Sequence, residues 1–220
     1  MSRLRDELWQ VVAGIYDQVL AHPFLTGLTD GSLPREAFRH YVVQEAHFLP
    51  DYARAQAACA ARAPEAAAVR RFARDAVTTV EVEHSLVVEL LAAFGLGETE
   101  ARNLPAAPTT VGYASYLVRN CALGTFPEAL GALLPCYMIY ARVGEALLAR
   151  SSPDPLYAWW IETYGGEGYQ ETTAGALDLL DELTPGPGER ERMLDRALTT
   201  ARYEWLFWDA AWRREGWPCG

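Results

Sequence analysis

Apolar residues recur along most of the chain every three or four positions, which is the spacing of amphipathic helices. In the first segment this spacing links Leu8, Val11 and Ile15, and Ser2 ahead of them could serve as an N-cap. Helical signals of this kind dominate to the end of the chain. The pattern therefore predicts an all-α protein.

Prolines and glycines divide this pattern into separate helices. Residues 22–34 (HPFLTGLTDGSLP) are predicted to form a connection, and Pro34 suits the first turn of a second helix that ends near Arg62. That helix is expected to bend at Pro50. A third helix is expected over 64–94. It contains the β-branched stretch VTTVEVEHSLVV, but its length and its alanine-rich start favour a helix over a strand.

Residues 95–108 (GLGETEARNLPAAP) are predicted to form a second connection, ahead of five more helices. Breaks are expected at Gly165 with Gly166 and at the PGPG sequence of residues 185–188. No internal repeat, low-complexity tract or long linker divides the chain. The sequence therefore predicts one domain over residues 1–220, an all-α helical bundle. The five later helices are expected over 109–123, 126–150, 155–164, 167–183 and 189–214.

Composition and charge narrow the classes of partner. The chain is half hydrophobic and carries a formal net charge of −10, and its basic residues, which are all arginines, form no basic stripe. Binding to nucleic acid or to an anionic membrane depends on neutralising phosphate groups, so neither partner is expected. The N-terminal sequence MSRLRDELWQ lacks the apolar segment of a signal peptide, and the most apolar run, residues 129–141, is too short to span a bilayer.

Two glutamates lie on helical faces that should point into the core. Glu45 shares its face with Tyr41 and Phe48, and Glu204 shares its face with Phe207. A buried carboxylate is costly unless it has a hydrogen-bond donor, a metal or a ligand. An ordinary core glutamate bonded to an arginine or a tyrosine and a ligand-binding carboxylate are both consistent with this pattern.

The segment LLPCYMIYARVGE (133–145) places Cys136 directly after Pro135 and one turn before Tyr140. The four cysteines of the chain show no CxxC spacing, which predicts reduced thiols in a cytoplasmic protein. Cys136 could be a small core residue beside a helix irregularity, or a nucleophile that works with a nearby carboxylate. The phenols that could stack on and hydrogen-bond a flat, nitrogen-bearing ring are those of Tyr113, Tyr140 and Tyr164.

A metal site has weaker support in the sequence. Glu81 and His84 have the Glu-x-x-His spacing found in di-iron helical bundles, but a di-iron site needs a second such motif and the chain has none. Haem ligation by a single histidine is compatible with the spacing but has no positive signal. We therefore expect no metal site, and we expect His84 to be partly exposed or bonded within the structure.

Four segments of the chain together resemble the TenA or thiaminase II family. HPFLTGLTDGSLPREAFRHYVVQE is similar to the early segment of that family, and ALLPCYMIYARVGE is similar to its nucleophile helix. WIETYGGEGY resembles a turn of the family, and RYEWLFWDAAWRREGW resembles the helix that carries its catalytic acid. The resemblance covers nearly the whole chain. It implies a haem-oxygenase-like all-α fold and a homotetramer.

The resemblance also implies roles for individual residues. Cys136 matches the nucleophile, and Glu204 matches the acid that pairs with a pyrimidine ring nitrogen. Glu45 stands where the family usually has an aspartate that binds the substrate amine, and Phe48 stands where many members have a stacking tyrosine. These two departures affect the expected substrate preference. The pocket tyrosines of the family are matched by Tyr113, Tyr140 and Tyr164.

The implied reaction is hydrolysis of 4-amino-5-aminomethyl-2-methylpyrimidine to the 5-hydroxymethylpyrimidine by covalent cysteine catalysis, in thiamin salvage. Thiamin is a second candidate substrate, and no cofactor is required. Two alternatives stay open from the sequence. One is a metal-dependent oxygenase on the same bundle, and the other is a non-catalytic protein that binds a pyrimidine or has a regulatory role.

Overall fold

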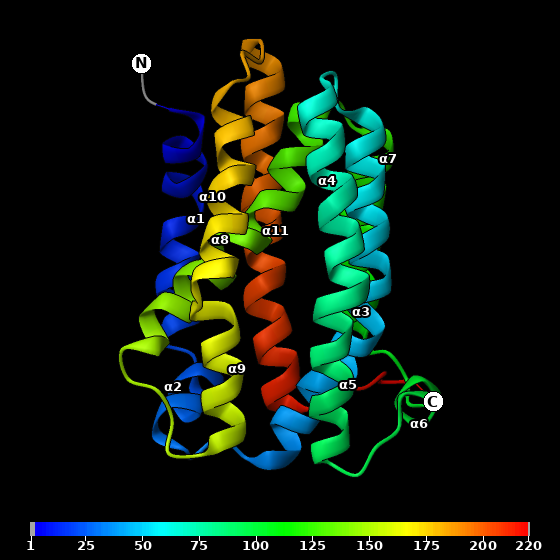
Figure 1. The fold of residues 1–220 in the computed structure, drawn as a ribbon, viewed down its shortest axis with the longest axis vertical. Helices are drawn as coiled ribbons and strands as arrows, with labels where there is room; N and C mark the ends of the chain where they lie inside the picture. The colour runs from blue at the N-terminus through cyan, green and yellow to red at the C-terminus, as the bar shows by residue number, and fades with distance from the viewer. Residues whose placement is uncertain (1–2, 220) are drawn as a thin grey trace. The chain divides into compact units, whose positions relative to one another are not determined.

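The computed structural model describes residues 3–219, and these form helices joined by short connections (Figure 1). No strand occurs among residues 3–219, so the predicted all-α class is confirmed. In chain order the elements are α1 (Leu4–Leu20), α2 (Pro23–Asp30), α3 (Arg35–Arg62), α4 (Ala66–Thr78), the π-helix η1 (Thr79–Glu83), α5 (His84–Ala93), α6 (Glu98–Asn103), α7 (Pro108–Leu123), α8 (Phe126–Leu148), α9 (Pro155–Gly165), α10 (Glu167–Asp181) and α11 (Pro187–Arg213).

The chain divides into two compact units of helices. Unit 1 comprises Met1–Leu33 and Pro127–Trp205, and unit 2 comprises Pro34–Phe126 and Leu206–Gly220. Unit 1 therefore holds α1, α2, α9, α10, almost all of α8 and the larger part of α11, whereas unit 2 holds α3 to α7 and the end of α11. The single domain over residues 1–220 stays a prediction.

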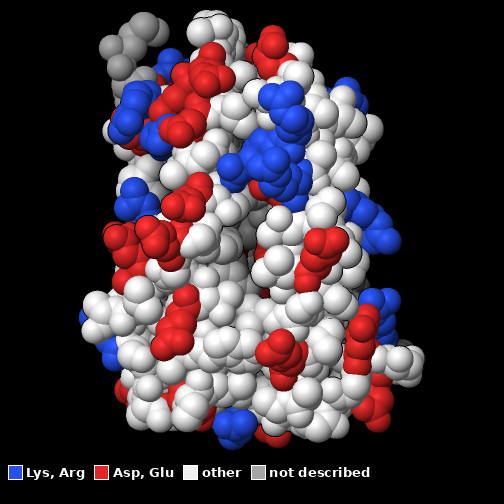
Figure 2. Space-filling view, viewed as in Figure 1, with Lys and Arg blue, Asp and Glu red and all other residues white. Residues whose placement is uncertain are grey.

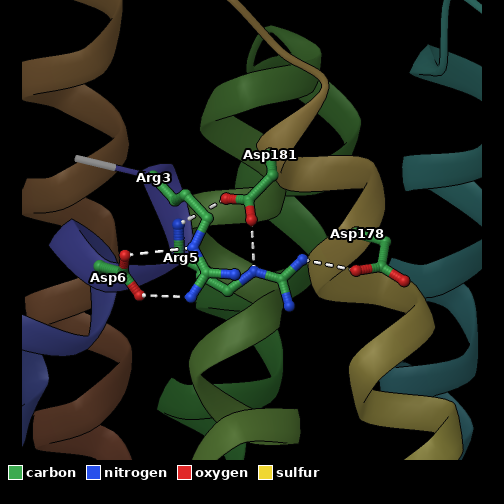
Figure 3. A network of polar contacts seen from close by, with 5 residues as sticks. All are labelled: Arg3, Arg5, Asp6, Asp178 and Asp181. Carbon is green, nitrogen blue, oxygen red and sulfur yellow. Dashed lines mark hydrogen bonds and ion pairs between the residues drawn. The ribbon is translucent and has the colours of Figure 1, made fainter. Parts of the chain in front are cut away.

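In unit 1, both α1 and α9 lie against α2 and α10. Arg5 on α1 forms an ion pair with Asp181 on α10, and its Nη2 donates to Asp178 Oδ1 at 2.6 Å (Figure 3). The backbone N–H of Arg5 also donates to Asp181 Oδ1 at 3.0 Å. The first N–H groups of a helix have no partner within it, so this aspartate of α10 supplies one to α1. Within the same network Arg3 pairs with Asp6 at 3.3 Å.

In unit 2, α3 is the central helix, because it contacts α4, η1, α5, α6 and α7. Sixteen of its 28 residues are buried, more than the single apolar stripe of a surface helix provides. Pro50 lies inside α3, as the sequence predicts. A helix covered on several sides can hold polar side chains in fixed positions, and Gln44 and Glu45 are both buried here.

Residues 22–34, which the sequence predicts to be a connection, contain the eight-residue helix α2. Its N-cap is His22, whose Nδ1 accepts a hydrogen bond from the Phe24 N–H at 3.1 Å, and Pro23 occupies the first helical position. Gly31 ends the helix with a φ of 76°, a left-handed conformation that favours glycine. The prediction was wrong because eight residues contain too few turns for periodicity to show.

A second short helix, α6, lies within the predicted connection of residues 95–108. Its first turn is closed by a hydrogen bond of 2.8 Å from the Gly97 N–H to Glu100 Oε2. Two acidic residues in that turn also favour the positive end of the helix dipole. The capping residues identify this helix, because six residues are too few for a periodic apolar spacing to be visible in the sequence.

The longer predicted helices are confirmed within a few residues. The third, expected over 64–94, is helical from Ala66 to Ala93 but changes to the π-helix η1 between α4 and α5. The predicted N-cap Ser2 lies outside the described residues, and the N-cap position of α1 is occupied by Arg3.

Charged side chains of both signs gather in small separate groups on the face shown in Figure 2. On this face the arginines form no continuous stripe. Among the described helices, none combines the length and the apolar character needed to cross a membrane.

Candidate active site

Cys136 lies in the middle of α8, where every residue from Ala129 to Ala141 is buried. The helix continues through Pro135, which has no N–H to donate to the carbonyl of Gly131. Cys136 itself is 5% exposed. The sequence prediction of a thiol inside an apolar helix is therefore confirmed, although burial alone is compatible with a structural thiol.

Aromatic rings gather one turn beyond this thiol. The ring centroids of Tyr140 and Tyr164 lie 4.9 Å apart with an interplanar angle of 54°. Trp160 packs on Tyr164 at 4.8 Å and lies 6.3 Å from Tyr140, so the three rings form one cluster across α8 and α9. Two of the three predicted phenols, those of Tyr140 and Tyr164, are thus brought together, and Trp160 joins them without having been predicted.

Gly144 allows α9 to approach α8 at the position that holds Tyr164. A Cβ atom built on Gly144 would overlap the backbone of Tyr164 and of Gly165. Gly165 in turn faces the carbonyl of Gly144. Since only glycine leaves this space free, the two glycines bring the Tyr164 backbone directly against the helix that carries Cys136.

Gln170 on α10 hydrogen-bonds to both helices at this contact between α8 and α9. Its Nε2 donates to the carbonyl of Ala141 on α8 at 2.8 Å and to the carbonyl of Tyr164 at 3.4 Å. One amide group therefore joins the residue after Tyr140 to the end of α9. A bond to each helix restricts how far Tyr164 can move relative to Tyr140.

Glu204 is the second predicted catalytic residue and lies on α11, where it is 1% exposed. The same helix is hydrogen-bonded to α8 through Thr200, whose Oγ1 donates to the carbonyl of Ala132 at 2.7 Å. Ala132 precedes Cys136 by one turn, and Thr200 precedes Glu204 by one turn. Unit 1 therefore joins the helix of the thiol and the helix of the carboxylate by a direct bond.

The remaining predicted site residues, Glu45, Phe48 and Tyr113, belong to unit 2 and are all buried. The rings of Phe48 and Tyr113 lie 4.9 Å apart, and Phe207 lies 5.5 Å from Phe48. Tyr52, one turn further along α3, stacks on Phe48 at 5.5 Å. Three elements thus converge on Phe48, and the burial predicted for Glu45 is confirmed.

Gln44, next to Glu45 on α3, sets the start of α7. Its Oε1 accepts from the Ala107 N–H at 2.8 Å and from the Thr110 hydroxyl at 2.7 Å. Its Nε2 donates to the carbonyl of Pro105 at 3.3 Å. Because both ends of the amide are used, α7 is held in a fixed position on α3, and this brings Tyr113 onto Phe48.

Two other cysteines of unit 2, Cys59 on α3 and Cys121 on α7, are fully buried. Burial raises the pKa of Cys121 to about 12. Burial, with further contributions from Cys121 and Asp75, raises the pKa of Cys59 well above its ordinary value. A thiol in this state is a poor nucleophile, because the thiolate is the reactive form. All four cysteines of the chain are free.

No group of three or more histidine, cysteine, aspartate or glutamate side chains among residues 3–219 is arranged to hold a metal. His84 lies 3.5 Å from Glu98 and its side chain is 28% exposed, so it is partly exposed as predicted. His22, another of the four histidines, serves as the N-cap of α2.

Sequence reasoning missed several residues that position the predicted ones: Gly131, Gly144, Trp160, Gln170 and Thr200. Two of them had a local signal. Gly144 is a glycine inside a long apolar helix, where a packing reason is expected. Thr200 precedes Glu204 by one turn on the same helical face. The partners of both residues lie on other helices and have no signal in the local sequence.

Comparison with known proteins places this arrangement in a family. A family model described as the TENA/THI-4/PQQC family matches residues 9–214. An aminopyrimidine aminohydrolase of Bacillus subtilis is 34% identical over 217 residues, which are 98% of this chain and 92% of that protein. An aminopyrimidine aminohydrolase of Halalkalibacterium halodurans is 28% identical over 96% of each chain.

Solved structures show the same fold. A TenA homologue from P. horikoshii has a TM-score of 0.88 at 26% identity and covers 96% of this chain and 99% of its own. A TenA family transcription regulator from Silicibacter has a TM-score of 0.89 at 26% identity, with coverage of 96% and 97%. A domain with a heme oxygenase-like fold from Shewanella denitrificans has a TM-score of 0.75 at 16% identity, with coverage of 95% and 92%. This last similarity concerns the fold alone and confirms the predicted haem-oxygenase-like fold.

Proposed function

The chain belongs to the TENA/THI-4/PQQC family, and from this premise we propose that it hydrolyses 4-amino-5-aminomethyl-2-methylpyrimidine to the 5-hydroxymethylpyrimidine. It is a hydrolase of the aminopyrimidine aminohydrolase type and acts in thiamin salvage. The observation that carries the proposal is the bond that joins the helix of the buried thiol Cys136 to the helix of the buried carboxylate Glu204.

The proposed reaction begins at the thiol. The Cys136 sulfur, as the thiolate, forms a bond to a ring carbon while Glu204 gives a proton to a ring nitrogen, so the ring loses its aromaticity. An ordinary cysteine has a pKa of about 8.5, so a neighbouring group must accept the thiol proton. The phenols of Tyr140 and Tyr164 and the carboxylate of Glu204 are the groups proposed to relay it.

The second half of the reaction exchanges the substituent on the 5-methylene. The electron pair released in the ring expels the amine, which takes up a proton and leaves as ammonia. Water then adds to the methylene, and the sulfur departs with its electron pair so that the ring becomes aromatic again. The net change is the addition of one water molecule and the loss of one ammonia molecule.

Glu45, Phe48 and Tyr113 are proposed to recognise the substrate. Glu45 accepts hydrogen bonds from the exocyclic amine, and the rings of Phe48 and Tyr113 stack on the pyrimidine. Burial of these three side chains supports such a role, because a carboxylate and aromatic rings that are shielded from water bind an aromatic amine more strongly than exposed ones. The proposal also includes thiamin as a slower substrate, a homotetramer and a cytoplasmic location, which the family resemblance supports.

The test is ammonia release by the purified protein from the aminomethylpyrimidine, with the hydroxymethylpyrimidine measured in parallel by chromatography. Equal molar amounts of the two products are expected. Tight binding of the pyrimidine without ammonia would contradict the proposal and favour a binding or regulatory protein. Loss of ammonia release after treatment with a chelator would contradict the metal-free reaction, and a bound metal without ammonia release would favour the metal-dependent oxygenase.

A further inference from the structure

Besides the ion pairs of Glu128 on α8 with Arg192 and Arg196 on α11, one buried hydroxyl group joins these two helices. Thr200 is completely buried, and its Oγ1 donates to the Ala132 carbonyl at 2.7 Å. Its neighbour Thr199 bonds instead to the Asp195 carbonyl at 3.1 Å, four residues back on its own helix. That internal bond is a common choice for a threonine within a helix. Thr200 bonds to another helix.

Close packing of the two backbones makes this bond possible. A Cβ atom built on Gly131 would overlap the backbone carbonyl of Met193 on α11. Met193, Ala197, Thr200 and Glu204 recur at helical spacing and are all buried, so they occupy one face of α11. Glycine at residue 131 therefore brings this face against α8, and the carboxylate of Glu204 lies on the same face.

The bond has a defined place relative to the two proposed catalytic groups. The carbonyl of Ala132 is the one that the Cys136 N–H reaches in an α-helix, since it lies four residues earlier. Thr200 likewise lies four residues before Glu204. The hydroxyl thus joins the turn that precedes the thiol to the turn that precedes the acid.

We propose that Thr200 is a positioning residue for the proposed hydrolysis, because its hydroxyl bonds α11 to α8 one turn from both Cys136 and Glu204 and so sets the position of Glu204 relative to Cys136. This inference rests on the proposed function. Thr200 touches neither the substrate nor the reacting atoms in this role. Proton transfer depends steeply on distance, and a displacement of about 1 Å can cost about a hundredfold in rate, so a modest loss of register should lower turnover.

The first experiment replaces the hydroxyl by groups of similar size. Thr200→Val keeps the branched shape but cannot donate, and we expect its kcat to fall about tenfold while KM changes less than about threefold. Thr200→Ser keeps the donor and should retain at least about a third of the wild-type kcat. Thr200→Ala provides a second variant without the donor if the valine variant does not fold.

Two other threonines provide matched controls. Thr199→Val removes a hydroxyl from the same helix without affecting α8. Thr173→Val removes a buried hydroxyl that donates from α10 to the Tyr137 carbonyl of α8 at 3.5 Å. Both controls should keep kcat within about twofold of wild type, although Thr173→Val should lower Tm.

The deciding measurement is a double-mutant cycle with Glu204→Gln. If Thr200 acts through the acid, adding Thr200→Val to Glu204→Gln should change kcat by less than about twofold. A tenfold loss in both backgrounds would overturn the inference, as would a Thr200→Val enzyme with wild-type kcat and a lowered Tm. A wild-type protein that binds the pyrimidine but releases no ammonia would instead reject the proposed function, and the positioning role with it.

Discussion

Unit 1 and unit 2 each bury cysteines on long packed helices, but the surroundings of these thiols differ. Cys136 in unit 1 lies on α8, which is hydrogen-bonded to the helix of Glu204 and carries Tyr140, whose ring contacts that of Tyr164. Cys59 and Cys121 in unit 2 lie where burial raises the pKa of both thiols, that of Cys121 to about 12. Burial is common to all three, so burial does not distinguish a nucleophile from a core thiol.

The difference lies in the groups that can exchange protons with the thiol. Under the proposed function, the phenols of Tyr140 and Tyr164 and the carboxylate of Glu204 accept and return the proton of the Cys136 thiol. The polar groups near Cys59 are occupied with one another. The Thr79 hydroxyl lies 2.9 Å from Gln56 Oε1 and 3.0 Å from Glu83 Oε1, and Asp75 pairs with Arg71 at 3.0 Å. We therefore expect unit 2 to respond to changes at its thiols through stability and unit 1 through rate.

The largest expected effect comes from replacing each thiol by serine. Cys136→Ser should reduce ammonia release below a few per cent of wild type while binding and Tm stay close to wild type. Cys59→Ser and Cys121→Ser bury a hydroxyl in an apolar site, which should cost about 1–3 kcal/mol of unfolding free energy and leave kcat within about twofold. Rates and urea unfolding curves of all three variants would check this. Substantial turnover by Cys136→Ser would contradict obligatory covalent catalysis.

The next effect concerns the carboxylate. Glu204→Gln should bind substrate but lose roughly two to four orders of magnitude in kcat, the usual scale for a positioned acid–base group. Glu7→Gln is the matched control, since Glu7 is a buried glutamate of the same unit that pairs with Arg190 and does not join α8 to α11. It should lower Tm and leave the rate nearly unchanged. If Glu204→Gln behaves like this control, Glu204 is structural.

A smaller effect is expected for substrate preference. Glu45 is one methylene longer than the aspartate of the resembling family, and Phe48 lacks a phenol, so the bulky thiazolium of thiamin should be penalised. We expect kcat/KM to favour the aminomethylpyrimidine over thiamin by at least about tenfold, or about 1.4 kcal/mol. Competition kinetics measure this ratio. The double variant Glu45→Asp with Phe48→Tyr should move it towards parity, and a wild-type preference for thiamin would reject the interpretation.

The last expected effect is a pH dependence confined to stability, with no change in rate. Burial, with a further contribution from Asp75, raises the pKa of Glu83 to about 7 from an ordinary value of 4.5. The folded state therefore holds a proton that the unfolded state releases between these values, and stability should fall as the pH rises from about 4.5 through 7. Because Glu83 is partly exposed, we expect a loss of about 1–3 kcal/mol.

Glu83→Gln should remove this loss without changing kcat, and urea unfolding at pH 5 and pH 8 would measure it. The same pH slope in the variant and in wild type would show that another group is responsible. A change in kcat would contradict the expected separation between the two units.

The long helices were predictable because each repeats its apolar spacing over several turns. The two short helices α2 and α6 were not, because a helix of one or two turns is stabilised by its caps and by packing rather than by its own propensity. The buried state of Glu45, Glu204 and Cys136 followed from the same periodicity. The roles of these residues remain predictions from the family resemblance.

The sequence by itself determined the all-α class, the long helices and the buried faces, because helical periodicity is a local property. Only the tertiary structure determined which helix the Thr200 hydroxyl bonds to and which backbone approaches Gly144. A threonine hydroxyl within a helix can bond to its own helix, as Thr199 does, or to a neighbouring one, as Thr200 does. The choice depends on the distance between two backbones. That distance is set by glycines and contacts on segments far apart in the chain, which no local pattern records.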